Sequence, residues 1–321
     1  MAGERHCWGR NWGQDMQRKD RLDLFGGSVL LGVTLLLAFN QIVIKAVNEG
    51  FQPVFFAGLR SALAVGFVWA WLALRGRPPR LTRASLGAGL LIGAVFAAEF
   101  MFLFLALDLT SVGRASLIMY SMPVWFAILA HFGLGERITP LKAAGLGLAF
   151  AGCATALLTR PATGEASLAG DLCALAAAWG WALTAFVARR PVMRAEGPEM
   201  QLFWMVLVSA PILLLLAPLF GPVIRDIQLW HVAGLVFQAS VVVAGGFIAW
   251  LWLMSVYPAP TVASFSFLTP VLALCLGALI FGEAVSASLL LAAVLVAAGV
   301  VLINRPAAAA RPSDGPKESV S

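Results

Sequence analysis

The chain has 321 residues, of which 60% are hydrophobic and 12% are charged, and its formal net charge is +6. Soluble domains carry roughly twice that charged fraction, so most of the apolar surface must face lipid or other helices. The basic residues stand between apolar runs instead of in one patch, which argues for membrane orientation and against a nucleic-acid partner.

Ten apolar runs are each long enough, at about 18–25 residues, to cross a bilayer as a helix. They are continuously apolar and do not alternate, which favours helices over strands. We therefore expect an all-α polytopic membrane protein with ten transmembrane helices. In chain order the runs are Phe25–Ile44, Val54–Leu74, Leu86–Leu107, Val112–Phe132, Leu141–Leu158, Leu168–Val187, Leu202–Phe220, Trp230–Met254, Thr261–Phe281 and Val285–Ile303.

Local chemistry marks several helix starts. Pro53 precedes the second run, Thr139 and Pro140 offer an N-cap and a first helical residue for the fifth, and Ser286 can cap the tenth. The tail of residues 1–24 is polar and basic and has no cleavage site typical of a signal peptide. The tail of residues 305–321 is predicted to be disordered.

The distribution of Lys and Arg predicts the orientation. With both termini in the cytoplasm, 17 of the 22 basic residues fall in inside segments. Only three, Lys45, Arg160 and Arg225, fall outside, and Arg60 and Arg114 lie within runs. Because cytoplasmic loops carry an excess of positive charge, we expect both chain ends to be cytoplasmic in a plasma (inner) membrane.

Two stretches, Ser111–Glu136 and Pro258–Glu283, share one skeleton at an offset of 147 residues. Pro123-Val124 and Gly135-Glu136 in the first copy correspond to Pro270-Val271 and Gly282-Glu283 in the second. The chain is therefore expected to contain two related halves, 25–158 and 168–304. Five helices per half would place the second half upside down, which gives two inverted five-helix repeats with a site near the midplane between them. Such halves can work by alternating access, opening to one side at a time.

The sequence resembles the drug/metabolite transporter superfamily and, within it, the EamA-type ten-helix transporters. The matching pieces are FNQIVIK, FQPVFFAGLRSALA, LALDLTSVGRAS, PVWFAILAHFGLGERIT and TPVLALCLGALIFGEAVS. The resemblance implies export of small metabolites, often amino acids or amphipathic compounds, by a plasma-membrane carrier that does not use ATP. It also implies a central cavity lined by the first four helices of each half, with the fifth and tenth helices more peripheral.

Arg60 and Glu99 are charges well inside apolar runs, and such charges are costly in a membrane. At 1.5 Å per residue both lie about 12–13 Å below the outer surface, so neighbouring helices could bring them together. They either bind a substrate's carboxylate or ammonium group or form a fixed ion pair between the second and third helices. Glu99 is also the candidate for proton coupling. Family members commonly carry an arginine at the Arg60 position, which is compatible with a structural role there.

Further candidates for the substrate site are polar or aromatic. Asn40 and Gln238 lie at about 9–11 Å depth, where helix-to-helix hydrogen bonding is their common use. Hydroxyls that precede the two prolines can satisfy freed carbonyls or contact cargo, and mid-span indoles can line a site for aromatic cargo or simply pack. The residues predicted to bind the substrate are Asn40, Arg60, Glu99, Tyr120, Trp181, Gln238, Trp250 and Ser266.

Three other charged residues are interpreted as structural. Glu136 and Glu283 precede the starts of the fifth and tenth helices, where a carboxylate favours the helix dipole. Arg114 is placed near the outer end of the fourth helix, where it can extend to lipid headgroups.

Motifs for enzymes are missing from the sequence. There is no nucleotide-binding GxxxxGK[ST] loop, no HExxH and no GxSxG, and the four cysteines lack the CxxC spacing. We therefore predict no catalytic residues, no metal and no cofactor. The expected partners are a small-molecule substrate and the lipid bilayer, with a homodimer as an open option. The main interpretation is a metabolite exporter, and the alternatives are an uptake carrier of the same fold or a non-transporting scaffold or sensor.

Overall fold

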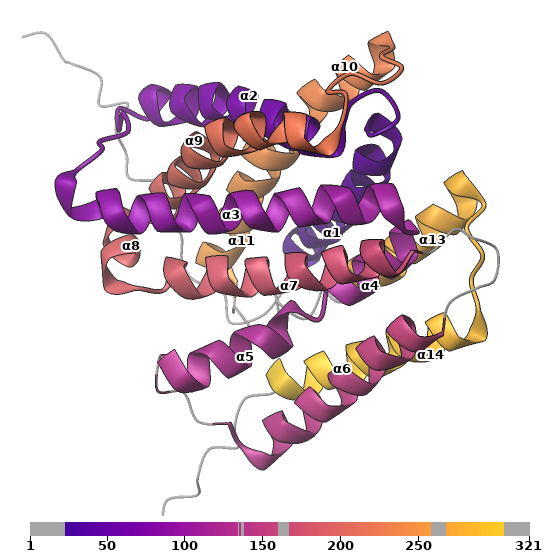
Figure 1. Ribbon diagram of the computed structural model, residues 1–321. Helices are drawn as coiled ribbons and strands as arrows, with labels where there is room; N and C mark the ends of the chain where they lie inside the picture. The colour runs from indigo at the N-terminus through magenta and orange to yellow at the C-terminus, as the bar shows by residue number, and fades with distance from the viewer. Residues whose placement is uncertain (1–22, 134, 136–137, 160–166, 258–267, 305–321) are drawn as a thin grey trace, which may run out of the picture.

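The computed structural model describes residues 23–133, 135, 138–159, 167–257 and 268–304, and the regular secondary structure of this part is helical apart from a single bridge between Phe51 and Ile224 (Figure 1). The helices are α1 Leu24–Val47, α2 Pro53–Leu74, α3 Arg83–Leu109, α4 Val112–Met119, α5 Met122–Gly133, α6 Pro140–Leu158, α7 Leu168–Ala188, α8 Pro191–Glu196, α9 Pro198–Leu216, η1 Ala217–Phe220, α10 Leu229–Phe237, η2 Gln238–Gly246, α11 Phe247–Val256, α13 Leu268–Phe281 and α14 Ala287–Asn304.

Seven helical stretches in the described part are long and apolar enough to cross a membrane, and α13 and α14 are shorter apolar helices. The expectation of an all-helical, multi-pass membrane protein is confirmed. The number of ten spans stays a prediction.

Predicted helix starts agree with the caps that the structure shows. The Thr139 hydroxyl accepts from the Lys142 amide at 3.3 Å, and the Ser286 hydroxyl accepts from the Leu289 amide at 3.2 Å. Each bond satisfies one of the amides that a helix start leaves without an intrahelical partner.

Two predicted spans are less regular than expected. The run Val112–Phe132 is broken at Tyr120-Ser121 into α4 and α5, just before Pro123. Proline has no amide hydrogen and disfavours a helical residue before it, and the Ser121 hydroxyl instead donates to the Ile118 carbonyl at 2.6 Å. The run Trp230–Met254 contains the nine-residue π-helix η2 between α10 and α11.

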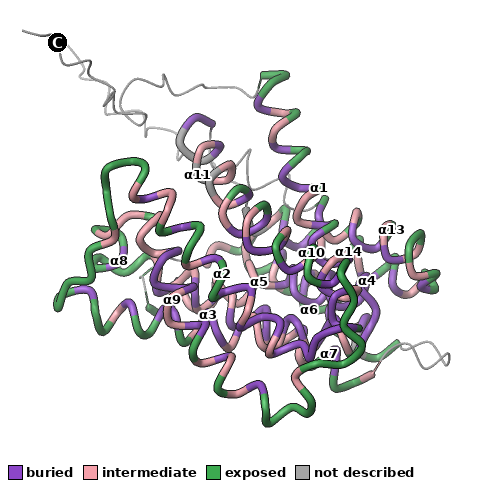
Figure 2. The backbone as a smooth tube through the Cα atoms, turned by 90° about the horizontal axis from the view of Figure 1, so that it is seen from above, coloured by how far each residue is buried: buried purple, intermediate pink, exposed green. Residues whose placement is uncertain are grey.

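Buried residues concentrate toward the middle of the helix bundle, and exposed ones lie at its periphery (Figure 2). The helix α3 packs along α7, and α2 packs along α9. The pair α6 and α14 runs side by side at one edge of the molecule (Figure 1). Glycines permit this close approach: a Cβ at Gly299 of α14 would lie 2.5 Å from the Gly145 carbonyl oxygen of α6.

Helices at corresponding positions of the two halves make corresponding contacts. The second helices pair with each other as α2 and α9, and the fifth as α6 and α14. The third helix of each half packs against the first helix of the other, as α3 with α7 and as η2 and α11 with α1. The fourth helix of each half also packs against the first helix of the other half, because α5 contacts α7 and α13 contacts α1. Contacts between the halves are therefore reciprocal.

Candidate functional site

Helices of both halves carry buried polar side chains, and nine of these residues are called here the buried polar layer. It includes residues from both halves, and most of the predicted site residues belong to it. Its members are Asn40, Gln41, Arg60, Glu99, Ser116, Tyr120, Thr184, Gln238 and Thr269. Buried polar groups are expected to be hydrogen-bonded, so the unfilled ones show where a polar ligand could bind.

Arg60 of α2 is the bulkiest charged side chain in this layer, and only 2% of its surface is exposed. Its guanidinium carbon lies 3.8 Å from the centroid of the Phe100 ring and 5.2 Å from that of Phe104, both on α3. Cation–π contacts of this kind hold the plane of the guanidinium in place. The Nε and Nη2 atoms are buried and have no hydrogen-bond partner among the described residues.

Glu99 of α3 has a different partner. Its carboxylate accepts a hydrogen bond from the Thr184 hydroxyl of α7 at 2.8 Å. The α7 backbone comes so close that a Cβ at Gly180 would lie 2.8 Å from the Glu99 Cα. Among the described residues no ion pair joins Glu99 to Arg60, whose Nε and Nη2 atoms stay without a hydrogen-bond partner. The two residues share the layer, and α2 and α3 are not locked by a direct salt bridge between them.

Asn40 and Gln238, which were placed at comparable depth, contact each other. The Gln238 side-chain amide donates to the Asn40 backbone carbonyl at 3.2 Å. This bond leaves Asn40 Oδ1 and Gln238 Oε1 buried without partners. Beside them, the Ser116 hydroxyl donates to Gln41 at 2.6 Å. Two carbonyl acceptors on α1 and η2 therefore stay unfilled.

The aromatic candidates lie in two different places. Tyr120 and Trp181 meet edge to face, with ring centroids 5.5 Å apart, and both are at least half-buried. Trp250 instead packs in a separate cluster between α1 and α11, with Leu30 and Tyr257 among its members. Ser266 lies outside the described residues.

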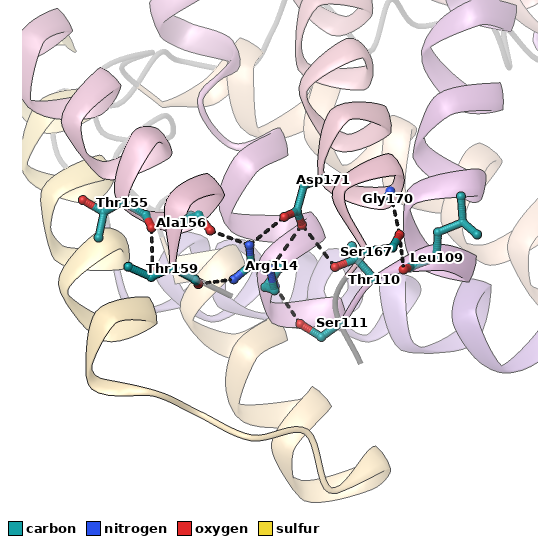
Figure 3. A network of polar contacts seen from close by, with 10 residues as sticks. All are labelled: Leu109, Thr110, Ser111, Arg114, Thr155, Ala156, Thr159, Ser167, Gly170 and Asp171. Carbon is teal, nitrogen blue, oxygen red and sulfur yellow. Dashed lines mark hydrogen bonds and ion pairs between the residues drawn. The ribbon is translucent and has the colours of Figure 1, made fainter. Parts of the chain in front are cut away.

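A second buried charge network was missed from the sequence (Figure 3). Arg114 was expected to reach lipid headgroups, and this expectation is wrong, because its side chain is buried and pairs with Asp171 of α7. Its Nε and Nη2 donate to the two Asp171 oxygens at 3.2 and 2.6 Å. Its Nη1 donates to the Thr159 carbonyl at 2.9 Å, and its Nη2 also bonds the Ala156 carbonyl.

The Arg114 network fastens the ends of α4, α6 and α7 to one another. The Thr110 hydroxyl also donates to Asp171, at 3.1 Å. The signal that could have revealed it was Asp171 itself, an acid near the start of an apolar run with no basic neighbour in the sequence.

Glu283 is structural as predicted, but its helix is not the predicted one. Its carboxylate accepts from the amides of Val112 and Gly113, at 2.7 and 3.2 Å. It therefore caps α4 of the first half, where a negative charge favours the helix dipole. It also pairs with Lys45 of α1 at 3.1 Å, and Lys45 donates to the Thr110 carbonyl at 2.9 Å. Glu136 lies outside the described residues.

The same end of the molecule carries a third link between the halves. Arg225 donates to both oxygens of Asp108, at 2.7 and 2.9 Å, and to the Asn48 carbonyl. This hydrogen bonding to Asp108 raises the pKa of Arg225 above its ordinary value. The adjoining backbones form an antiparallel bridge at Phe51 and Ile224. We call this end, with residues 48–52, 110–111, 159, 167, 221–228 and 282–286, the predicted outer end.

The opposite end also carries links between the halves in the described part. The Tyr257 hydroxyl donates to Asp23 at 2.6 Å. There Arg75 approaches Glu199 at 3.7 Å, with the two side chains 38% and 25% exposed. The Trp71 indole donates to the same carboxylate at 3.1 Å. Exposed pairs of this length contribute little to stability.

Comparison with known proteins assigns the family. The model of the EamA-like transporter family matches residues 24–158 and again 168–305. The chain belongs to this family. It is therefore a multi-pass membrane transporter of the drug/metabolite transporter superfamily and not an enzyme.

Several curated relatives align over nearly their full length. The probable amino-acid metabolite efflux pumps of Escherichia coli and Salmonella typhimurium are 28% and 29% identical, each covering 89% of this chain and 95% of the relative. The uncharacterized transporter YoaV of Bacillus subtilis is 22% identical over 85% of this chain and 94% of its own. A solved crystal structure has the same fold, with a TM-score of 0.60, 22% identity and coverage of 85% of this chain and 95% of that one.

Proposed function

We propose that this protein is a secondary transporter that exports a small organic metabolite across the plasma membrane by alternating access. The observation that carries the proposal is the way the two halves are joined. The four ion pairs between described residues all connect one half to the other, and three of them lie at the predicted outer end. Links of this kind close one side of a carrier while the other side can open.

The reciprocal contacts between the halves support two inverted five-helix repeats of 25–158 and 168–304. An exchange of the halves turns α3 on α7 into η2 and α11 on α1, and leaves the pairs α2–α9 and α6–α14 in place. Two similar halves in opposite senses produce two similar states, one open to each side of the membrane. The family match to each half supports the same division.

Charge supports the direction of export. The excess of Lys and Arg in the loops opposite the predicted outer end favours a cytoplasmic location for those loops and for both chain ends. The three ion pairs at the predicted outer end support a state that is closed toward the outside. This is the state in which an exporter loads its cargo.

The buried polar layer is the proposed cargo site. It draws on helices of both halves, and three of its residues, Asn40, Arg60 and Gln238, hold unfilled hydrogen-bonding atoms. Relatives named as amino-acid metabolite efflux pumps suggest a cargo with both charged and apolar parts. Glu99 is the proposed proton-coupling group, because it is a buried carboxylate whose one described hydrogen bond comes from a hydroxyl.

A reversible cross-link tests alternating access. Residues that oppose each other in an antiparallel bridge have Cβ atoms about 4.5–5.5 Å apart, within reach of a disulfide. We expect Phe51→Cys combined with Ile224→Cys, in a variant whose four native cysteines are replaced by alanine, to lose transport on oxidation and to regain it on reduction. Each single variant under the same oxidant is the control.

Transport would be measured as counterflow of labelled metabolites in proteoliposomes of known orientation. Complete cross-linking with an unchanged transport rate would contradict alternating access at this end. Counterflow that requires cargo on the outer face alone would instead favour uptake.

A further inference from the structure

The two unpartnered atoms of Arg60 belong to the same edge of its guanidinium. Nε and Nη2 each carry an N–H that points outward along that edge, and both are buried without a described partner. This edge matches the two oxygens of a carboxylate in spacing and direction. We propose that it is a carboxylate receptor, and that the cargo of this transporter is an organic carboxylate bound there through both oxygens.

The surroundings of Arg60 hold the receptor ready. Phe100 lies against the face of the guanidinium at 3.8 Å, so the plane cannot turn without losing this contact. A second ring of α3, that of Phe104, has its centroid 5.2 Å from the guanidinium carbon. A receptor whose orientation is fixed before binding loses less entropy when the ligand arrives.

No acidic side chain of the described part fills the edge. The nearest candidate, Glu99, uses its carboxylate to accept from Thr184 on α7. Leaving buried donors of a charged group unpaired is costly, and the cost is removed when a ligand supplies the two acceptors. This makes the edge a binding site and not a packing contact.

The other unfilled atoms indicate what the rest of the cargo carries. Asn40 Oδ1 and Gln238 Oε1 are acceptors, and both lie on elements that meet at η2, which also packs against α2. They would receive hydrogen bonds from N–H or O–H groups of the ligand. The cargo class is therefore a carboxylate with at least one further hydrogen-bond donor.

This inference rests on the proposed function for its biological use, but its test needs only binding. The purified protein would be heated with pairs of compounds that differ only in carboxylate against primary amide, such as L-tryptophan and L-tryptophanamide. A ligand that binds the folded state raises its melting temperature by mass action. We expect carboxylates to stabilise the wild-type protein and their amides to bind at least about tenfold more weakly, as for the loss of charge-assisted bonds.

Variants locate the effect on Arg60. Arg60→Lys keeps the positive charge but removes the two-point edge, and should abolish the preference for carboxylates. Arg77→Lys, an exposed position with no described side-chain contact, is the matched control and should keep it. If Arg60→Lys does not fold, the carboxylate and amide pairs on the wild-type protein still decide the question.

The outcomes separate the two proposals. Equal stabilisation by acids and amides, or no stabilisation by any carboxylate of the panel, would overturn the receptor. A carboxylate preference that survives in Arg60→Lys would overturn it as well. Carboxylates that bind through Arg60 but are not moved in proteoliposomes would leave the receptor standing and refute the exporter. Counterflow of a neutral cargo that is unchanged in Arg60→Lys would support the transporter and refute the receptor.

Discussion

Replacing Glu283 by glutamine should open the predicted outer end of the protein. The carboxylate accepts from two backbone amides of α4 and pairs with Lys45, so it joins the segment after α13 to both α1 and α4. Glutamine keeps the shape but has one acceptor oxygen and no charge. Its amide group would face the Gly113 N–H donor-to-donor.

The size of the effect follows from these contacts. Hydrogen bonds to a charged group are worth about 1.5–3 kcal/mol each, and glutamine retains part of one. Lys45 keeps its bond to Thr110 and is partly exposed, so it adds little to the loss. The state closed toward the outside should lose about 2–4 kcal/mol, which shifts its equilibrium with the outward-open state by roughly 30- to 1,000-fold.

A buried serine provides the assay. Ser116 lies one turn below the α4 start that Glu283 caps, and it is completely buried. In a background without native cysteines, Ser116→Cys should react slowly with an impermeant maleimide added from outside. Adding Glu283→Gln should raise the labelling rate by at least tenfold. Glu49→Gln, which removes an exposed carboxylate at the same end, is the control. A lower melting temperature with an unchanged labelling rate would refute the reasoning, because Glu283 would then support the fold and not the closed state.

Three further predictions test the other contacts. Asp171→Asn should lower the free energy of unfolding by about 3–5 kcal/mol, because it leaves a buried Arg114 charge uncompensated, and the double variant Arg114→Met, Asp171→Leu should recover much of it in denaturation assays. Glu99→Gln should make transport independent of pH in proteoliposomes, and an unchanged pH profile would remove Glu99 as the coupling group. Gly299→Ala should destabilise the protein, because its added Cβ would lie 2.5 Å from α6 backbone atoms. The control is Gly147→Ala on α6, whose Cβ would meet nothing within 4 Å and which should be neutral or stabilising. Equal melting temperatures of the two variants would argue against close packing of α6 and α14.

Features set by local sequence could be predicted. The caps at Thr139 and Ser286 depend on residues three apart, and the break before Pro123 depends on the missing amide of proline. The helical, multi-pass character follows from the apolar runs alone. Such features need no knowledge of which helices are neighbours.

Features set by distant partners could not be predicted in the same way. Arg114 and Asp171 are 57 residues apart, and Glu283 caps a helix 171 residues away. Only the packing of α4 against α7 and α13 brings these groups together. The π-helix η2 is a further case, because its apolar composition is also that of an ordinary α-helix. For the same reason the sequence could predict a similar membrane depth for Arg60 and Glu99. It could not predict that Arg60 contacts Phe100 or that Glu99 accepts a hydrogen bond from Thr184.

The proposed receptor and the links at the outer end bear on each other through energy. A ligand shifts a conformational equilibrium only by the difference in its affinity for the two states. The buried pair of Arg114 and Asp171 and the Glu283 cap are expensive to separate, whereas the exposed pair of Arg75 and Glu199 is not. If opening outward means separating these links, the cargo must bind more tightly as the outer end opens. The guanidinium edge of Arg60 is suited to this task, because α2 packs against α9 and η2 of the second half, so that movement of the halves changes which groups face the edge. On this argument a substrate's carboxylate would drive the conformational change as well as being recognised.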